Sequence, residues 1–131
     1  MTIRQASCRC GQLKLTATGE PVRISVCHCL ACQQRTGSSY GVQARFPAEN
    51  IDVGGRTTVY VRTADSGNKI TYFFCPLCGS TVYYYLNSLP SVIAVPVGAF
   101  ADPEFPPPHM SFYESRRHAW VGLPENIEHN D

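Results

Sequence analysis

The sequence predicts an antiparallel all-β domain with one short helix. Many short runs alternate polar and apolar residues with a period of two, as half-buried strands do. These runs are rich in β-branched and aromatic residues, which fit a pleated surface. Ten glycines and ten prolines divide the chain of 131 residues into short segments, a pattern typical of strands joined by tight turns. We expect one domain that spans residues 1–131, because this length suits a single hydrophobic core.

Seven runs share the alternating pattern and are the predicted strands. They cover residues 13–18, 22–26, 41–46, 57–62, 69–74, 81–85 and 92–95. Gly54-Gly55 and Ser66-Gly67-Asn68 are typical turn sequences between them. Residues 30–36 contain good helix formers and end at Gly37, which predicts one short helix. The proline-rich residues 102–108 predict an extended surface connector.

Composition narrows the class of protein. The chain is 44% hydrophobic and only 16% charged, which argues against disorder. Its formal charge of +1 becomes mildly acidic if all cysteines bind two divalent ions as thiolates, so we expect no nucleic-acid partner. Residues 1–7 lack the apolar core of a signal peptide. The longest apolar stretch, 92–101, is about half of the roughly twenty residues of a membrane span. We therefore expect a cytoplasmic protein without a membrane partner.

All seven cysteines fall in three tight clusters. The clusters read Cys8-Arg-Cys10-Gly11, Cys27-His28-Cys29-Leu30-Ala31-Cys32 and Cys75-Pro76-Leu77-Cys78-Gly79. Crowded thiolates repel one another unless a cation lies among them, and zinc suits such ligands. Seven ligands cannot form two closed sites of four. One closed site and one site with three protein ligands is the simplest division, and an open fourth position is typical of catalytic zinc.

Spacing favours a particular division of the ligands. Cys75 and Cys78 have the spacing of a zinc knuckle. Cys8 and Cys10 form a half-site, because one intervening residue strains a disulfide, and the knuckle is its natural complement. Cys27, Cys29 and Cys32 can then face a second ion. Two alternatives stay open: this cluster completes a closed site while another pair is catalytic, or Cys29 and Cys32 form a redox dithiol.

The histidines are weaker candidates. His28 can be the fourth ligand of the second ion, can support the ligands, or can contact a substrate. His109, His118 and His129 are expected to be surface or packing residues, although the first two lie near Trp120 in the sequence.

With these motifs, the chain resembles the glutathione-dependent formaldehyde-activating (GFA) family, whose domain also occurs in centromere protein V. The resemblance rests on C-x-C-G, on C-H-C-x-x-C followed by Arg35-Thr36-Gly37-Ser38, and on Phe74-Cys75-x-x-Cys78-Gly79-Ser80. It covers about residues 7–123. It implies a zinc-containing β-tent of packed antiparallel sheets. It also implies a structural zinc on Cys8, Cys10, Cys75 and Cys78, and a labile zinc at an active site on Cys27, Cys29 and Cys32.

The resemblance further implies a carbon–sulfur lyase that is similar to S-(hydroxymethyl)glutathione synthase, which joins glutathione to formaldehyde. The glutathione sulfur would become the fourth ligand and lose its proton there. The chain lacks the extra length of the named enzymes, so the resemblance indicates the site better than the substrate, which can be formaldehyde or another small aldehyde. Arg35, Arg116 and Arg117 are candidates to bind the glutathione carboxylates, or are ordinary solvated charges. The aromatic residues Tyr83-Tyr84-Tyr85 and Trp120 either line a pocket or fill the core.

A second function from another class stays open. The domain can be a non-catalytic, zinc-stabilised interaction module, as the centromere relative suggests. Exposed strand edges also make a homodimer plausible.

Overall fold

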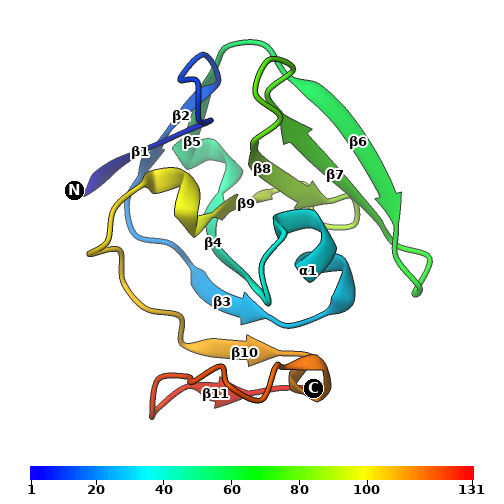
Figure 1. The fold of residues 1–131 in the computed structure, drawn as a ribbon. Helices are drawn as coiled ribbons and strands as arrows, with labels where there is room; N and C mark the ends of the chain where they lie inside the picture. The colour runs from blue at the N-terminus through cyan, green and yellow to red at the C-terminus, as the bar shows by residue number, and fades with distance from the viewer.

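A computed structural model describes all 131 residues and contains two β-sheets (Figure 1). The smaller sheet has the order β1-β2-β5 and is built from β1 (Ile3–Ser7), β2 (Lys14–Thr18) and β5 (Ile51–Gly54). The larger sheet has eight strands in the order β11-β10-β3-β4-β9-β8-β7-β6. These strands are β3 (Arg23–Cys27), β4 (Gly41–Pro47), β6 (Thr58–Thr63), β7 (Lys69–Phe74), β8 (Thr81–Leu86), β9 (Val92–Pro96), β10 (Met110–Phe112) and β11 (Glu128–His129).

The prediction of a mainly β fold with one short helix is confirmed. Each of the seven predicted runs forms a strand, and the helix α1 (Leu30–Thr36) lies where the sequence placed it. Short 3-10 turns cover Ala48–Asn50, Val97–Phe100 and Glu114–Arg116. No helix is long and apolar enough to cross a membrane.

The pairing is antiparallel with one exception. Strand β10 runs parallel to both β3 and β11, because the long connector after β9 carries the chain back across the molecule before β10 begins. The connector 102–108 has no regular structure, as predicted. It is not wholly on the surface, however, since Phe105 is buried against Phe100.

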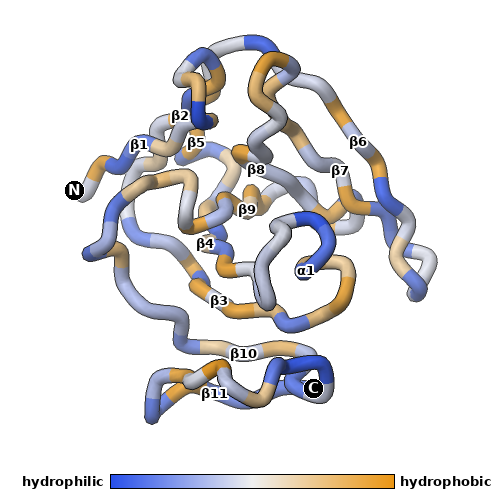
Figure 2. The backbone as a smooth tube through the Cα atoms, in the orientation of Figure 1, coloured by the Kyte–Doolittle hydropathy of each residue, from blue (hydrophilic) through white to orange (hydrophobic).

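The main core lies between the two sheets. Its buried side chains come from both sheets and from the segment after β9: Ala6, Leu13, Leu15, Ala17, Ile24, Ala44, Phe46, Val82, Val95, Phe100 and Phe105. Figure 2 shows hydrophobic segments along β3 and β9, in the middle of the molecule. Burial of each large apolar side chain contributes roughly 1.5–3 kcal/mol. Cys8 and Cys75 belong to the same cluster, so a metal site there is continuous with the core.

Helix α1 is held by its ends and not by an apolar face, since none of its residues is fully buried. The Cys29 side chain caps its N-terminus, and Gly37 ends it with a φ of 71°, a conformation that glycine adopts without strain. The Gln33 amide donates hydrogen bonds to the carbonyl oxygens of His28, at 2.8 Å, and Arg116, at 3.2 Å. These contacts fix α1 between β3 and the segment that follows β10.

Candidate metal and substrate site

Four cysteines from two distant parts of the chain form one group. The Sγ atoms of Cys8, Cys10, Cys75 and Cys78 all lie within 4.8 Å of one another. Cys8 and Cys10 follow β1 in the smaller sheet, and the other two lie in the turn between β7 and β8 in the larger sheet. Cys8 and Cys75 are buried, whereas Cys10 and Cys78 are exposed. The group therefore joins the two sheets at one edge of the core.

The sulfur spacing fits a tetrahedral metal ion. Cys10 Sγ lies 3.6 Å from Cys8 Sγ and 3.7 Å from Cys75 Sγ, which is too far for a disulfide of about 2.05 Å. Ligands at about 2.3 Å from a tetrahedral zinc ion are about 3.8 Å apart. The group can therefore hold a metal ion with little movement.

Donors around the buried sulfurs suit thiolates. The Leu13 N–H donates to Cys8 Sγ and the Leu77 N–H to Cys75 Sγ, each at 3.3 Å. The Gln12 side-chain amide also donates to Cys75 Sγ at 3.0 Å and to the Arg56 carbonyl oxygen at 2.8 Å. Gln12 was not among the residues that the sequence singled out, because its role depends on segments that meet only in the fold.

The remaining cysteines form the second group, again within 4.8 Å of one another. Cys27 ends β3, and Cys29 and Cys32 lie at the N-cap and in the first turn of α1. Cys27 is buried, whereas Cys29 and Cys32 are half-buried. This group offers only three ligand atoms, and two of them lie near the surface. A bound ion would therefore have room for a ligand from outside the chain.

Hydrogen bonds within the group of Cys27, Cys29 and Cys32 stabilise a thiolate. Hydrogen bonds from the Cys27 and Cys32 thiols, and then from the backbone N–H groups of Cys32 and Ala31, hold the pKa of Cys29 far below its ordinary value. Hydrogen bonds of the Cys27 thiol with Cys29 and Cys32, together with burial, raise the pKa of Cys27. One thiolate is thus stabilised by two thiols, and a metal ion would displace the remaining protons.

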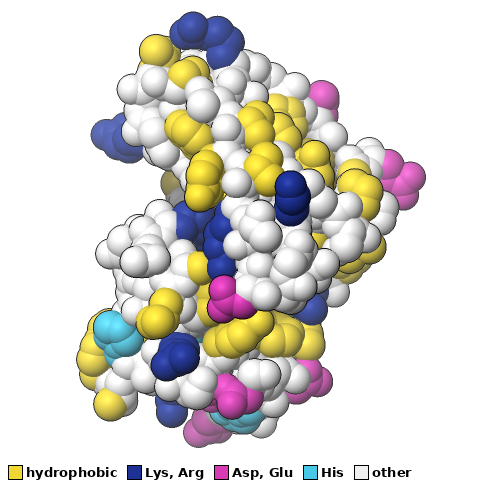
Figure 3. Space-filling model, turned by 90° about the vertical axis from the view of Figure 1, so that its right-hand side faces the viewer, with side chains coloured by type: hydrophobic (Ala, Val, Ile, Leu, Met, Phe, Trp, Pro, Cys, Tyr) yellow, Lys and Arg dark blue, Asp and Glu magenta, His cyan; other side chains and the backbone are white.

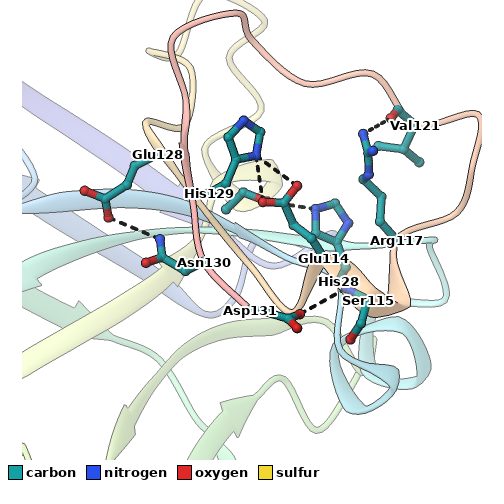
Figure 4. Close-up of polar contacts among 10 residues, drawn as sticks. His28, Glu114, Ser115, Arg117, Val121, Glu128, His129, Asn130 and Asp131 are labelled. Atoms are coloured by element: carbon teal, nitrogen blue, oxygen red, sulfur yellow. Dashed lines mark hydrogen bonds and ion pairs between the residues drawn. The ribbon is translucent and has the colours of Figure 1, made fainter.

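His28 does not lie with these ligands. Neighbouring residues in an extended segment point to opposite sides, and the His28 ring is fully buried. Its Nε2 lies 3.1 Å from Ser111 Oγ on β10, and it lies near the ion pair of Glu114 and His129 (Figure 4). Burial lowers the pKa of His28. The expectation that His28 is a ligand or contacts the substrate finds no support in this position.

Arg35 lies on α1 beside the second cysteine group. Its guanidinium carbon is 5.4 Å from the centre of the Tyr72 ring and 5.1 Å from that of Tyr84. Burial works to lower the pKa of Arg35, but the ionisable groups of Tyr84, Cys32 and Tyr72 around it raise this pKa above its ordinary value. Arg35 therefore stays charged next to Cys32 and offsets part of the negative charge of the thiolates.

Two other predicted arginines lie in the segment that contacts α1 through Gln33. The Arg117 side chain donates to the Val121 carbonyl oxygen at 3.0 Å (Figure 4), and both Arg116 and Arg117 are exposed in the segment after β10. Trp120 is also exposed and meets His118 edge-on. Of the three consecutive tyrosines, Tyr84 is buried beneath Arg35.

The comparison with protein families agrees with this arrangement. A family model described as glutathione-dependent formaldehyde-activating enzyme matches residues 3–116. The chain belongs to this family. The matched residues of the GFA family model include both cysteine groups and Arg35.

A comparison with solved structures finds a protein of similar fold. A crystal structure of a Rhodobacter sphaeroides protein, a Northeast Structural Genomics target, matches this GFA chain with a TM-score of 0.57. The match covers 79% of this chain and 91% of that chain at 20% sequence identity. At this identity the likeness extends to the fold alone. A comparison with curated proteins finds no match.

Proposed function

We propose that this protein is a zinc-dependent carbon–sulfur lyase that resembles S-(hydroxymethyl)glutathione synthase. The reaction joins the sulfur of a small thiol such as glutathione to the carbon of formaldehyde or another small aldehyde. The thiol proton ends on the aldehyde oxygen, and the reverse reaction breaks the same carbon–sulfur bond. The observation that carries this proposal is the group of three cysteines, which offers three ligands, two of them near the surface, while the other four cysteines close around a separate site.

Each group of cysteines has its own role in this proposal. Cys8, Cys10, Cys75 and Cys78 would hold a structural zinc ion, and Cys27, Cys29 and Cys32 would hold a second, labile one. A zinc ion bound there would lower the pKa of a thiol substrate and so keep it reactive at neutral pH. The chain itself orients and balances these ligands. Cys29 is held in place as the N-cap of α1, and Arg35 compensates negative charge at Cys32.

Substitution of one cysteine ligand of the second site tests this function. We expect the zinc-loaded wild type to carry two zinc ions per chain and to accelerate adduct formation above the uncatalysed rate. Cys29→Ser should stay folded, keep one zinc ion and lose this acceleration, because only two sulfur ligands remain at the second site. Ser38→Ala, in the exposed turn after α1, is the matched control and should behave like the wild type.

Metal analysis by mass spectrometry, circular dichroism and adduct formation followed by NMR give the three readouts. A zinc-loaded wild type without any thiol–aldehyde activity would contradict the proposal. That outcome would favour a zinc-stabilised interaction module without turnover.

A further inference from the structure

A pocket of about 560 Å³ lies between α1 and the strands β6–β8. Its lining comes from α1, from three strands and from the end of the β7–β8 turn: Ala31, Gln34, Arg35, Tyr60, Arg62, Tyr72, Phe74, Gly79 and Thr81. This volume is in the usual range for a small-molecule site. Figure 3 looks onto this side of the molecule and shows Lys and Arg side chains recessed in a hollow of the surface.

The pocket carries positive charge, which at Arg35 is compensated in part by the neighbouring Cys32. Arg35 and Arg62 line it, and no acidic residue does. Both ion pairs of the chain, Arg4 with Glu20 and His129 with Glu114, lie elsewhere. The Nε atom of Arg35 is buried and has no hydrogen-bond partner, which is costly unless a ligand or water satisfies it.

Tyr60 and Tyr72 line the floor of the pocket, and Tyr84 continues their row across the sheet beside it. Tyr60, Tyr72 and Tyr84 lie opposite one another on β6, β7 and β8, with ring centres 6.5 Å and 5.1 Å apart. Arg35 covers the two inner rings. Tyr60 has no cation over it and is 59% exposed, and Arg62 lies two residues further on β6, on the same face of the sheet. The exposed ring of Tyr60 thus lines the same pocket as the guanidinium groups of Arg35 and Arg62.

We propose that Arg62, together with Arg35, binds a carboxylate of the thiol substrate in this pocket. The inference rests on the proposed function of the cysteine site. Guanidinium groups bind carboxylates with two parallel hydrogen bonds. Arg35 lies three residues after Cys32, so both share one face of α1. A carboxylate held in the pocket leaves the sulfur end of the substrate free to reach the three cysteines.

A probe without a free thiol tests the pocket separately from the chemistry. S-methylglutathione and its dimethyl ester differ in their carboxylates, and calorimetry on the zinc-loaded protein measures the affinity of each. We expect the ester to bind at least about tenfold more weakly than the acid. Arg62→Gln should weaken binding of the acid by roughly 10- to 100-fold, the equivalent of one charge-assisted hydrogen bond. It should also remove most of the preference for the acid, with Arg35 supporting the rest.

Two further variants sharpen the test. Arg62→Lys keeps the charge and should retain part of the preference. Arg56→Gln changes an exposed arginine in the turn before β6, outside the pocket, and should bind like the wild type. Equal affinity for acid and ester, no binding of either, or an Arg62→Gln variant with unchanged affinity would overturn the proposal. Acid-selective binding by a protein that has no thiol–aldehyde activity would support the pocket while contradicting the proposed reaction.

Discussion

At the scale of single residues, Tyr84 links the sheet to the site. Its ring is buried between Tyr72 and Arg35. Burial raises the pKa of Tyr84 well above its ordinary value, and the positive charge of Arg35 offsets only part of this rise. The phenol therefore stays protonated in the folded protein at a pH at which an unfolded tyrosine has ionised. This difference couples stability to pH on the alkaline side.

We expect the stability of the protein to fall as the pH rises above about 10, where the unfolded tyrosine loses its proton. Above this pH the unfolded state binds fewer protons than the folded state, so the free energy of unfolding decreases with pH. Tyr84→Phe should flatten this decrease, whereas Tyr113→Phe, at an exposed position, should leave it unchanged. Thermal unfolding followed by circular dichroism from about pH 8 to 11 checks the slope. An equal slope in all three proteins would show that Tyr84 does not cause the loss of stability at high pH.

At the scale of elements, the β7–β8 turn connects the two sheets. Cys75 and Cys10 are 65 positions apart in the chain. A metal ion that joins them restricts the unfolded chain much as a cross-link does, by roughly 4 kcal/mol for a loop of this length. We expect Cys75→Ser to unfold the domain or lower its free energy of unfolding by several kcal/mol, while Cys29→Ser stays folded. Urea unfolding of both variants makes the comparison. A stable Cys75→Ser protein that keeps its full metal content would refute this division of the ligands.

The sequence predicted those elements whose signal is local. Alternation over five or six residues is a property of the strand itself, so β2–β4 and β6–β9 could be found. Strands β10 and β11 are short: β10 exists through pairing with β3, which lies far away in the sequence, and β11 through pairing with β10. The same difference between local and long-range signals decides which site residues the sequence could predict. The cysteine pairs are local motifs, whereas Arg62 enters the site only because β6 pairs with β7 opposite α1.

At the scale of the whole molecule, the two cysteine groups differ in what they hold together. The group of four connects the turn after β1 with the β7–β8 turn and borders the main core. The group of three lies within six consecutive residues, and its segment is already fixed by the pairing of β3 and by the Gln33 hydrogen bonds. Loss of an ion from the second group therefore removes a ligand site, whereas loss from the first removes a connection between the sheets.

We expect a chelator to act in two steps on the zinc-loaded protein. The first ion should leave at low chelator concentration without loss of secondary structure, because only three protein sulfurs hold it. The second should leave only at higher concentration and together with unfolding, because binding to the folded state and stability are linked. Metal content and circular dichroism at each chelator concentration measure both steps. Release of both ions in one step, together with unfolding, would mean that the two groups are equally structural.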